Sequence, residues 1–281
     1  DAIHRSDLVR ALPDGPTGTG IKIGIISDGV DHRNDSISTG DLPADFQVLS
    51  NNCGGEEGIA MGEIVYDLSP GSDLAFADAT NNSIGMARHM QDLADAGCQV
   101  IVDDISHFDE PFFEDGILAK KADSLYQQNI LMVSSAGNHA RNNFIGEFVS
   151  QNGSPFMNFS SVGNASPDPT PHNPYLYVNI DPNRKASIIL QWDDRWGSSG
   201  NDYDLYLYDD DSKNILASST NVQEGSGDPY EIIEYKNMGT EPILGTIMVK
   251  LRSGVSKKVQ VMIFGVTVYV NNLVQSSSTY G

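Results

Sequence analysis

Cysteine is almost absent from this sequence, which has only Cys53 and Cys98 among 281 residues. Two thiols cannot build a disulfide framework, and they cannot form a zinc site on their own. Cys98 precedes an apolar run, so we expect it to be a small buried hydrophobic residue. The sequence also lacks any apolar run long enough to span a bilayer, which argues against a membrane partner.

Basic residues are scarce as well. There are 17 Lys and Arg against 38 Asp and Glu, which gives a formal net charge of −21. Such a surface repels phosphate backbones and anionic lipid, so we expect no nucleic-acid and no membrane partner. The acidity suits a salty or extracellular setting, and we expect a secreted protein. Hydrophobic residues make up 39% of the chain, enough for one large domain or two medium ones.

The first half of the chain alternates between strand and helix patterns. Nearly unbroken apolar runs predict strands of a buried, mostly parallel sheet. These runs span residues 21–26, 73–79, 99–106 and 130–134. Apolar residues at three- and four-residue steps predict helices over 56–71, 83–96 and 114–128. Residues 32–55 form a loop-rich connection. This alternation is typical of an α/β fold.

The pattern changes after about residue 150. Short alternating runs separated by turn residues predict strands, and no helix pattern interrupts them. These runs span residues 175–180, 186–192, 203–208, 215–218, 230–235, 245–251 and 259–270. They favour an antiparallel β-sandwich or jelly roll. We therefore predict one domain over residues 1–152 and a second over residues 153–281.

Acidic residues gather at the predicted element ends of the first half. Glu56 and Glu57 open the helix predicted over 56–71, in which Ala60, Met61, Ile64, Val65 and Leu68 form an apolar face. The simplest interpretation of the two glutamates is an attraction to the helix dipole, worth about 0.3–1 kcal/mol. Asp28 follows the first predicted strand, at the strand end where parallel sheets place their sites.

Asp103 and Asp104 lie inside the strand predicted over 99–106. Adjacent acids in an apolar strand are costly unless they are paired or neutralised, so a chemical role is one interpretation. The other interpretation is that they are strand-end acids that hold loop amides.

Four stretches together resemble the subtilase clan of serine peptidases. They are residues 21–31, the helix at Glu57 with Ser69-Pro70-Gly71, residues 100–106, and Ser134-Ser135-Ala136-Gly137-Asn138. The resemblance covers about residues 15–145. It implies a subtilisin-like, mostly parallel sheet with helices on both faces and the hydrolysis of a polypeptide substrate. Where subtilases carry a histidine base this chain has Glu57, which resembles the sedolisin branch and its Ser-Glu-Asp triad.

The resemblance also implies roles for individual residues. Glu57 would be the general base, and Asn138 would donate its amide to the developing oxyanion. The acid that sedolisins carry one turn after their glutamate is replaced here by Met61, so either Asp28 or Asp104 must orient Glu57. A carboxylate base, with a reference pKa of about 4.3, suits acidic pH unless burial raises that value. Asn138 has a simpler interpretation too, as a turn residue after Gly137.

The nucleophile is missing from the sequence. Subtilases and sedolisins carry their serine in a Gly-Thr-Ser type motif, and this chain contains no Thr-Ser pair. We therefore expect the N-terminal part of a serine-carboxyl endopeptidase, with the remaining C-terminal half of the catalytic domain as its partner, and no proteolysis by this chain alone. The alternative is a non-catalytic pseudoprotease whose β-sandwich binds polypeptide or carbohydrate.

The second half resembles the prepeptidase-type β-sandwich modules of secreted bacterial and archaeal proteases. The resemblance rests on Leu190-Gln191-Trp192-Asp193-Asp194 and on Asn201-Asp202-Tyr203-Asp204-Leu205-Tyr206-Leu207. Oxygen ligands for calcium could come from Asp193, Asp194, Asp202 and Asp204. Calcium is the only cofactor that the sequence suggests. Because their spacing does not fit an EF-hand loop, these residues have a second interpretation as turn and edge-strand acids.

Overall fold

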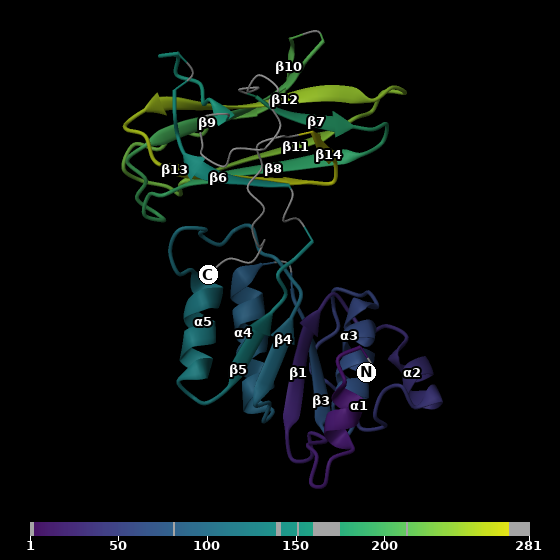
Figure 1. Ribbon diagram of the computed structural model, residues 1–281. Helices are drawn as coiled ribbons and strands as arrows, with labels where there is room; N and C mark the ends of the chain where they lie inside the picture. Colours follow the sequence, from purple (N-terminus) through teal and green to yellow (C-terminus); the bar gives the residue numbers. More distant parts are fainter. Residues whose placement is uncertain are drawn as a thin grey trace. The chain divides into compact units, whose positions relative to one another are not determined.

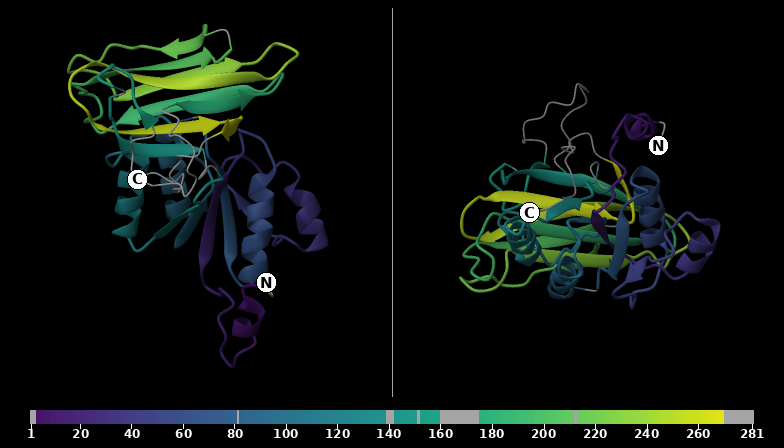
Figure 2. Two further views of the ribbon diagram at one scale, coloured as in Figure 1. Left: turned by 45° about the horizontal axis from the view of Figure 1, so that its top comes forward. Right: turned by 90° about the horizontal axis from the view of Figure 1, so that it is seen from below.

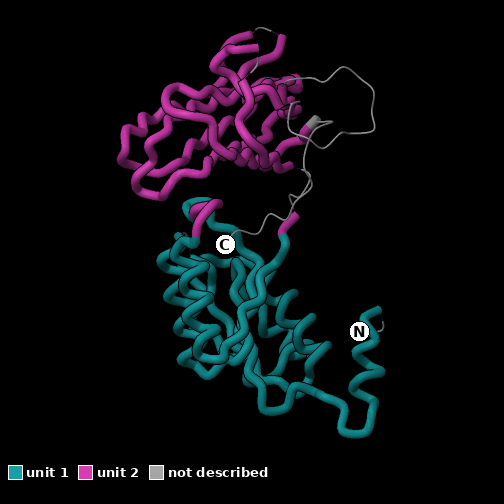
Figure 3. The backbone as a smooth tube through the Cα atoms, turned by 60° about the vertical axis from the view of Figure 1, so that its left-hand side comes forward, with its two compact units in different colours: residues 1–110, 115–136, 281 teal, residues 111–114, 137–280 magenta. Residues whose placement is uncertain are grey.

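The chain folds into two compact units (Figure 3). The computed structural model describes residues 3–80, 82–138, 142–150, 152–159, 175–211 and 213–269. Unit 1 contains the residues up to 110 together with 115–136, and unit 2 contains residues 111–114 and 137–280. The predicted border at residues 152–153 lies inside unit 2, because β6 (Asn143–Glu147) pairs with β13 (Lys258–Phe264).

Unit 1 is built on a five-stranded sheet in the order β2-β3-β1-β4-β5, with every neighbouring pair parallel. The strands are β1 (Lys22–Ser27), β2 (Gln47–Val48), β3 (Asp73–Asp78), β4 (Val100–Asp103) and β5 (Leu131–Ser134). The helices are α1 (Ser6–Arg10), α2 (Arg33–Thr39), α3 (Glu57–Leu68), α4 (Ser83–Asp95) and α5 (Ile117–Tyr126). The predicted parallel α/β architecture is confirmed. Helix α2 and strand β2 lie in the connection over residues 32–55 that was expected to be rich in loops, and α1 was not predicted.

Helices cover both faces of this sheet (Figure 1). On one face, α4 and α5 contribute Met90, Leu93 and Leu125 to a buried cluster that includes Ile26 and Ile101 of the strands. On the other face, α3 packs through Ile59 on a cluster that includes Ile25, Leu74 and Phe76. These two apolar layers on either side of the sheet hold the strands and helices of unit 1 together.

Helix α3 meets the sheet with only part of its predicted apolar face, which includes Met61 and Val65. Gly58, Ile59 and Gly62 are buried, whereas Ile64 is 61% exposed. A Cβ on Gly58 would lie 2.5 Å from a ring carbon of Phe76 and 2.7 Å from the carbonyl oxygen of Gly29. The absence of side-chain bulk therefore sets the orientation of the helix, because the glycine face approaches the sheet more closely than any larger residue allows.

Unit 2 consists of two antiparallel sheets that face each other across one core (Figure 2). One sheet has the order β10-β9-β12-β7-β14 and the other the order β11-β8-β13-β6. The remaining strands are β7 (Leu176–Ile180), β8 (Lys185–Trp192), β9 (Asp202–Asp209), β10 (Ile215–Ser219), β11 (Tyr230–Lys236), β12 (Ile243–Ser253) and β14 (Thr267–Tyr269). The predicted antiparallel β architecture is confirmed. The single strand predicted over 259–270 is split into β13 and β14 at Gly265, which has a φ of 78°.

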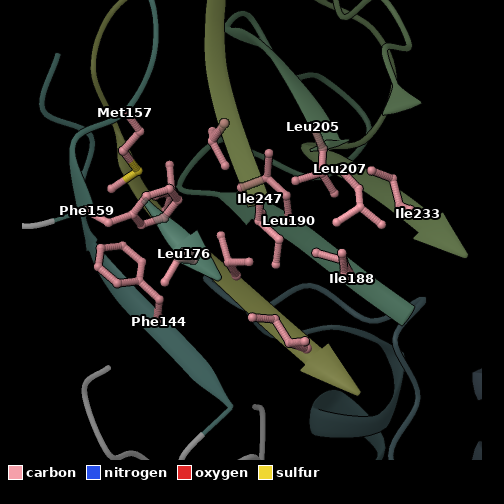
Figure 4. Close-up of a cluster of buried hydrophobic side chains, with 14 of the residues drawn as sticks. Phe144, Met157, Phe159, Leu176, Ile188, Leu190, Leu205, Leu207, Ile233 and Ile247 are labelled. Atoms are coloured by element: carbon pink, nitrogen blue, oxygen red, sulfur yellow. The ribbon is translucent and has the colours of Figure 1, made fainter. Parts of the chain in front are cut away.

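Alternating residues of both sheets fill the core of unit 2 (Figure 4). Leu205 and Ile247 come from one sheet, and Ile188 and Leu190 from the other. Trp192 is also fully buried, and its indole N–H donates to the Ser199 hydroxyl at 3.0 Å. In the described part of the chain, no helix combines the length and the apolar character that crossing a bilayer requires.

Replacing Gly58 with alanine tests the close approach of α3. We expect the free energy of unfolding to fall by about 1–3 kcal/mol, because the methyl group overpacks the contact with Phe76 and Gly29. The helical circular-dichroism signal is the measurement, since every described helix lies in unit 1. Gly200→Ala is the matched control, because a Cβ there meets nothing within 4 Å. Equal midpoints for the two variants would contradict the packing argument.

Candidate functional site

Polar residues gather at the carboxyl edge of the unit 1 sheet. Ser27 and Asp103 end their strands, and Asp28 and Asp104 follow them directly. Parallel strands end at the same edge, so the sheet brings together residues that are far apart in the sequence. The amino end of α3, which begins at Glu57, meets this edge through hydrogen bonds to Asp28.

Asp28 fixes the start of α3. Its Oδ1 accepts hydrogen bonds from the backbone N–H groups of Gly29 at 2.5 Å, Glu57 at 2.9 Å and Gly58 at 3.4 Å. The N-cap residue of the helix, Glu56, forms no side-chain cap of its own. Asp28 therefore takes over the capping role from 29 residues earlier in the chain, and it satisfies amides that the helix itself leaves unpaired.

Asp104 is the acid with an unmet hydrogen-bonding capacity. The Ser27 hydroxyl donates to its Oδ2 at 3.2 Å, while its Oδ1 is buried and accepts no hydrogen bond. Burial raises the pKa of Asp104, and the charges of Glu57 and Asp28 raise it further, although the bond from Ser27 opposes the shift. The structure thus brings Asp28, Glu57 and Asp104 close enough to interact, with the Glu57 side chain exposed.

Asp103 belongs to the opposite face of the sheet. It is 5% exposed and lies two residues after Ile101, which packs on the α4 side. The Ser134 hydroxyl of the neighbouring strand donates to Asp103 Oδ1 at 3.0 Å. Burial raises the pKa of Asp103 to about 6 even though this hydrogen bond opposes the shift. Asp103 therefore lies next to Asp104 in the sequence but on the other face of the sheet, so it does not belong to the acid cluster.

The sequence did not single out a second pair at the start of α3. The His32 ring contacts the Glu56 carboxylate through Nδ1, and this hydrogen bond raises the pKa of His32. Both side chains are exposed. The signal that pointed to this place was the run of polar residues after β1, which ends in Asp31-His32.

Asn138 lies beyond β5 and is exposed. It belongs to unit 2, whereas the acid cluster lies in unit 1. Its predicted part in an oxyanion site therefore stays a prediction.

The loop before α3 is anchored by a buried acid at the end of β3. Asp78 is 1% exposed and accepts hydrogen bonds from the Ser50 hydroxyl at 2.5 Å and from the backbone amides of Asn52 and Cys53 at 2.5 and 2.8 Å. Burial opposes its charge, but these donors hold the pKa of Asp78 below its usual value. Asp78 thus fixes the path of residues 50–53, which lead into the helix.

The four aspartates suggested as calcium ligands are not gathered into one group. Asp194 is saturated by protein donors, because it accepts hydrogen bonds from Ser199, Gly200 and Asn201 and pairs with Lys257 at 3.0 Å. Asp193 is exposed. Across the described ranges, no group of three or more His, Cys, Asp or Glu side chains is arranged to hold a metal ion. The other two predicted ligands, Asp202 and Asp204, lie together on β9.

These observations define an α/β unit with an acid cluster at the carboxyl edge of a parallel sheet, joined to an antiparallel β unit. No protein-family model and no curated protein matches the chain. Among solved structures, the chain is similar to the Clostridium perfringens CspB protease, with 13% identity and a TM-score of 0.55 over 96% of this chain and 67% of that chain. The self-cleaved protease domain of PatA matches with 22% identity and a TM-score of 0.31, over 44% of this chain and 52% of that domain. The first similarity shows a shared fold, and the second is too low to carry an argument.

Asp28→Ala tests the cap of α3. We expect a loss of about 1–3 kcal/mol in the free energy of unfolding, because the amides of Glu57 and Gly58 lose their acceptor. The loss is measured by chemical denaturation followed through the helical circular-dichroism signal. Asp45→Ala, which removes an exposed acid from the same unit, should leave the midpoint unchanged. An Asp28 variant as stable as this control would rule out the capping role.

Asp103→Asn tests the buried acid. Between about pH 4 and pH 6 the folded chain holds a proton on Asp103 that the unfolded chain has released, so raising the pH through this window destabilises the wild type. We expect the variant to gain up to about 3 kcal/mol relative to the wild type across this window, because its amide has no charge to bury. The measurement is the difference between the two stability curves against pH. A flat difference curve, like the one expected for the exposed control Asp92→Asn, would contradict the assignment.

Proposed function

We propose that this chain is the N-terminal part of a sedolisin-like subtilase, a serine-carboxyl endopeptidase that hydrolyses peptide bonds. The observation that carries the proposal is the Asp104 carboxyl, whose buried Oδ1 has no donor and which interacts with Glu57 and Asp28. The charges of these two neighbours oppose the loss of the Asp104 proton. One of the three carboxyl groups can then accept a proton while its neighbours hold it in position. The fold shared with the CspB protease supports the proposal.

Each acid has a distinct role in this mechanism. Glu57 is exposed at the start of α3, so it is the group that can reach a substrate or a nucleophile and act as the base. Asp104 orients Glu57 and holds a proton that the two carboxyl groups share. Asp28 is committed to the helix amides, so it positions Glu57 through the backbone. A serine hydroxyl needs such a base because it is a weak nucleophile by itself.

The nucleophile and the rest of the catalytic domain would come from a further part of the protein. The edge strand β5 supports a missing part of the domain, because its residues Leu131 and Val133 are 50% and 44% exposed. Val133 pairs with Val102, which packs on the α3 side of the sheet, so both residues extend that apolar face beyond α3. Exposed apolar residues on an open sheet edge are typical of a surface that another segment covers.

A non-catalytic binding role is the second candidate. Unit 2 carries half-buried tyrosines on the outer face of one sheet, where Tyr177 and Tyr208 both lie beside Thr246 of β12. Tyrosine combines an apolar ring with a hydroxyl group, which suits the binding of polypeptide or carbohydrate. This role predicts binding by unit 2 with no hydrolysis by the full-length protein.

Glu57→Gln in the full-length protein distinguishes the two roles. If Glu57 is the base, we expect peptide hydrolysis to fall by roughly 100- to 10,000-fold while the substitution leaves α3 folded. Glu63→Gln, on the same helix, is the matched control and should retain full activity. Undiminished hydrolysis by the Glu57 variant, or an encoded protein with no Gly-Thr-Ser type motif beyond Gly281, would reject the peptidase mechanism proposed here.

A further inference from the structure

A second group of unsatisfied acids lies in unit 2, apart from the proposed peptidase chemistry. Asp202 and Asp204 are two residues apart on β9, on the face opposite to Tyr203 and Leu205, which point into the core. Although they lie on the outer face of their sheet, Asp202 is only 2% exposed and Asp204 is fully buried. Burying two carboxylates side by side is costly unless something compensates their charge.

The nearby hydroxyl and basic side chains contact only one oxygen, Oδ2, of each carboxylate. Asp204 Oδ2 accepts the Tyr206 hydroxyl at 2.8 Å and lies 3.7 Å from Lys250 Nζ. The Arg252 guanidinium lies 3.6 Å from Asp202 Oδ2 and 4.0 Å from Asp204 Oδ2. The Oδ1 atoms of both residues are buried and accept no hydrogen bond. Two acceptors on one strand face are therefore left without a donor.

An amide oxygen next to these acids is unpaired as well. Gln223 is 4% exposed, and its backbone N–H donates to the Asp202 carboxylate. Its side-chain nitrogen donates to Glu231 Oε1 at 3.1 Å, so the residue bridges two buried acids. The remaining side-chain oxygen, Oε1, is buried without a donor. An amide oxygen beside carboxylates adds another acceptor where a donor is lacking.

The charges around these three oxygens do not balance. Asp202 and Asp204 are both buried, and Glu224, which lies in the same loop as Gln223, adds its negative charge near Asp202. Among the described residues, Lys250 and Arg252 are the basic side chains that pair with Asp202 and Asp204. Three acids near two bases leave an excess of negative charge, which a bound cation would offset.

We propose that unit 2 binds one Ca²⁺ ion through Asp202 Oδ1, Asp204 Oδ1 and Gln223 Oε1. All three are hard oxygen donors of the kind that calcium prefers, and backbone carbonyl groups or water complete its coordination. Two of the ligands are acids and the third is an amide, so the site differs from the set of four aspartates that the sequence suggested. Arg252, which pairs with Asp202, is half exposed.

The rival explanation is a proton shared between the two Oδ1 atoms. It would also satisfy both orphaned acceptors, and burial together with the charge of Asp204 does raise the pKa of Asp202. A shared proton leaves Gln223 Oε1 without a partner, whereas a cation satisfies all three oxygens. The cation is therefore the better account of the site.

Terbium luminescence tests the proposal on the whole chain after treatment with EDTA. Tb³⁺ replaces Ca²⁺ at oxygen sites, and Tyr206, which is bonded to Asp204, is placed to sensitise its emission. We expect a saturable signal that added Ca²⁺ displaces, and a Ca²⁺-dependent rise in the melting temperature of the sandwich. The fluorescence of Trp192 and Trp196, both in unit 2, follows that melting.

Variants separate the two explanations. Asp204→Asn should weaken Tb³⁺ binding at least about tenfold because it removes a carboxylate, and Gln223→Met should weaken it as well because it removes an oxygen ligand. Asp193→Asn, an exposed acid in the same unit, should bind like the wild type. A signal that is equal in Asp204→Asn and the wild type, or that millimolar Ca²⁺ does not displace, overturns the proposal. A chain that ignores Ca²⁺ but is stabilised by Asp204→Asn overturns it in favour of the shared proton. Because Gln223→Met keeps both aspartates, it still tests the site if Asp204→Asn fails to fold.

Discussion

The hydrogen bonds from the start of α3 to the Asp28 carboxylate are the interaction on which the candidate site depends. They join the end of β1 to the first turn of the helix, and so they determine where Glu57 lies relative to Asp104. Space is restricted around this contact, because a Cβ on Gly55 would lie 2.2 Å from Asp28 Oδ2. The same closeness is seen at Gly58, where the helix touches the sheet. Small residues and one fixed carboxylate therefore determine the geometry of the whole edge.

The hydrogen bonds that individual carboxylates accept explain how a chain with a net charge of −21 can bury so many acidic residues. Asp78, Asp194 and Glu231 each accept several hydrogen bonds, so their charge is spread over protein donors. Asp104, Asp202 and Asp204 differ, because each keeps one buried oxygen without a donor. A fold that satisfies most of its buried acids makes the unsatisfied ones informative, since leaving an acceptor unpaired costs stability.

Much of the architecture could be predicted from the sequence, because the period of its apolar residues distinguishes strands from helices over long segments. What the pattern could not give were contacts between distant residues. Strand β6 was missed because its partner β13 lies more than a hundred residues away, as the bond between Gln260 and Asn143 across 117 positions illustrates. The buried face of α3 was predicted in part, because Met61 and Val65 pack against the cluster beneath the helix, whereas Ile64 is exposed and Gly58 makes the closest approach. In the site, the expectation that Asp28 or Asp104 lies near Glu57 came from the resemblance to sedolisins, whereas the bond from Ser134 to Asp103 depends on sheet register.

The short segment Pro111–Glu114 has a consequence for how such a protein can evolve. It lies between β4 and α5 in the sequence, yet it belongs to unit 2, where the Phe112 amide donates to Gln191 and Glu114 accepts from the Trp196 amide. Unit 2 is therefore built from two separate segments of the sequence. Recombination that exchanged residues 137–269 as one block would leave these four residues facing a foreign surface. Homologous sandwiches should then change together with this tetrapeptide and not independently of it.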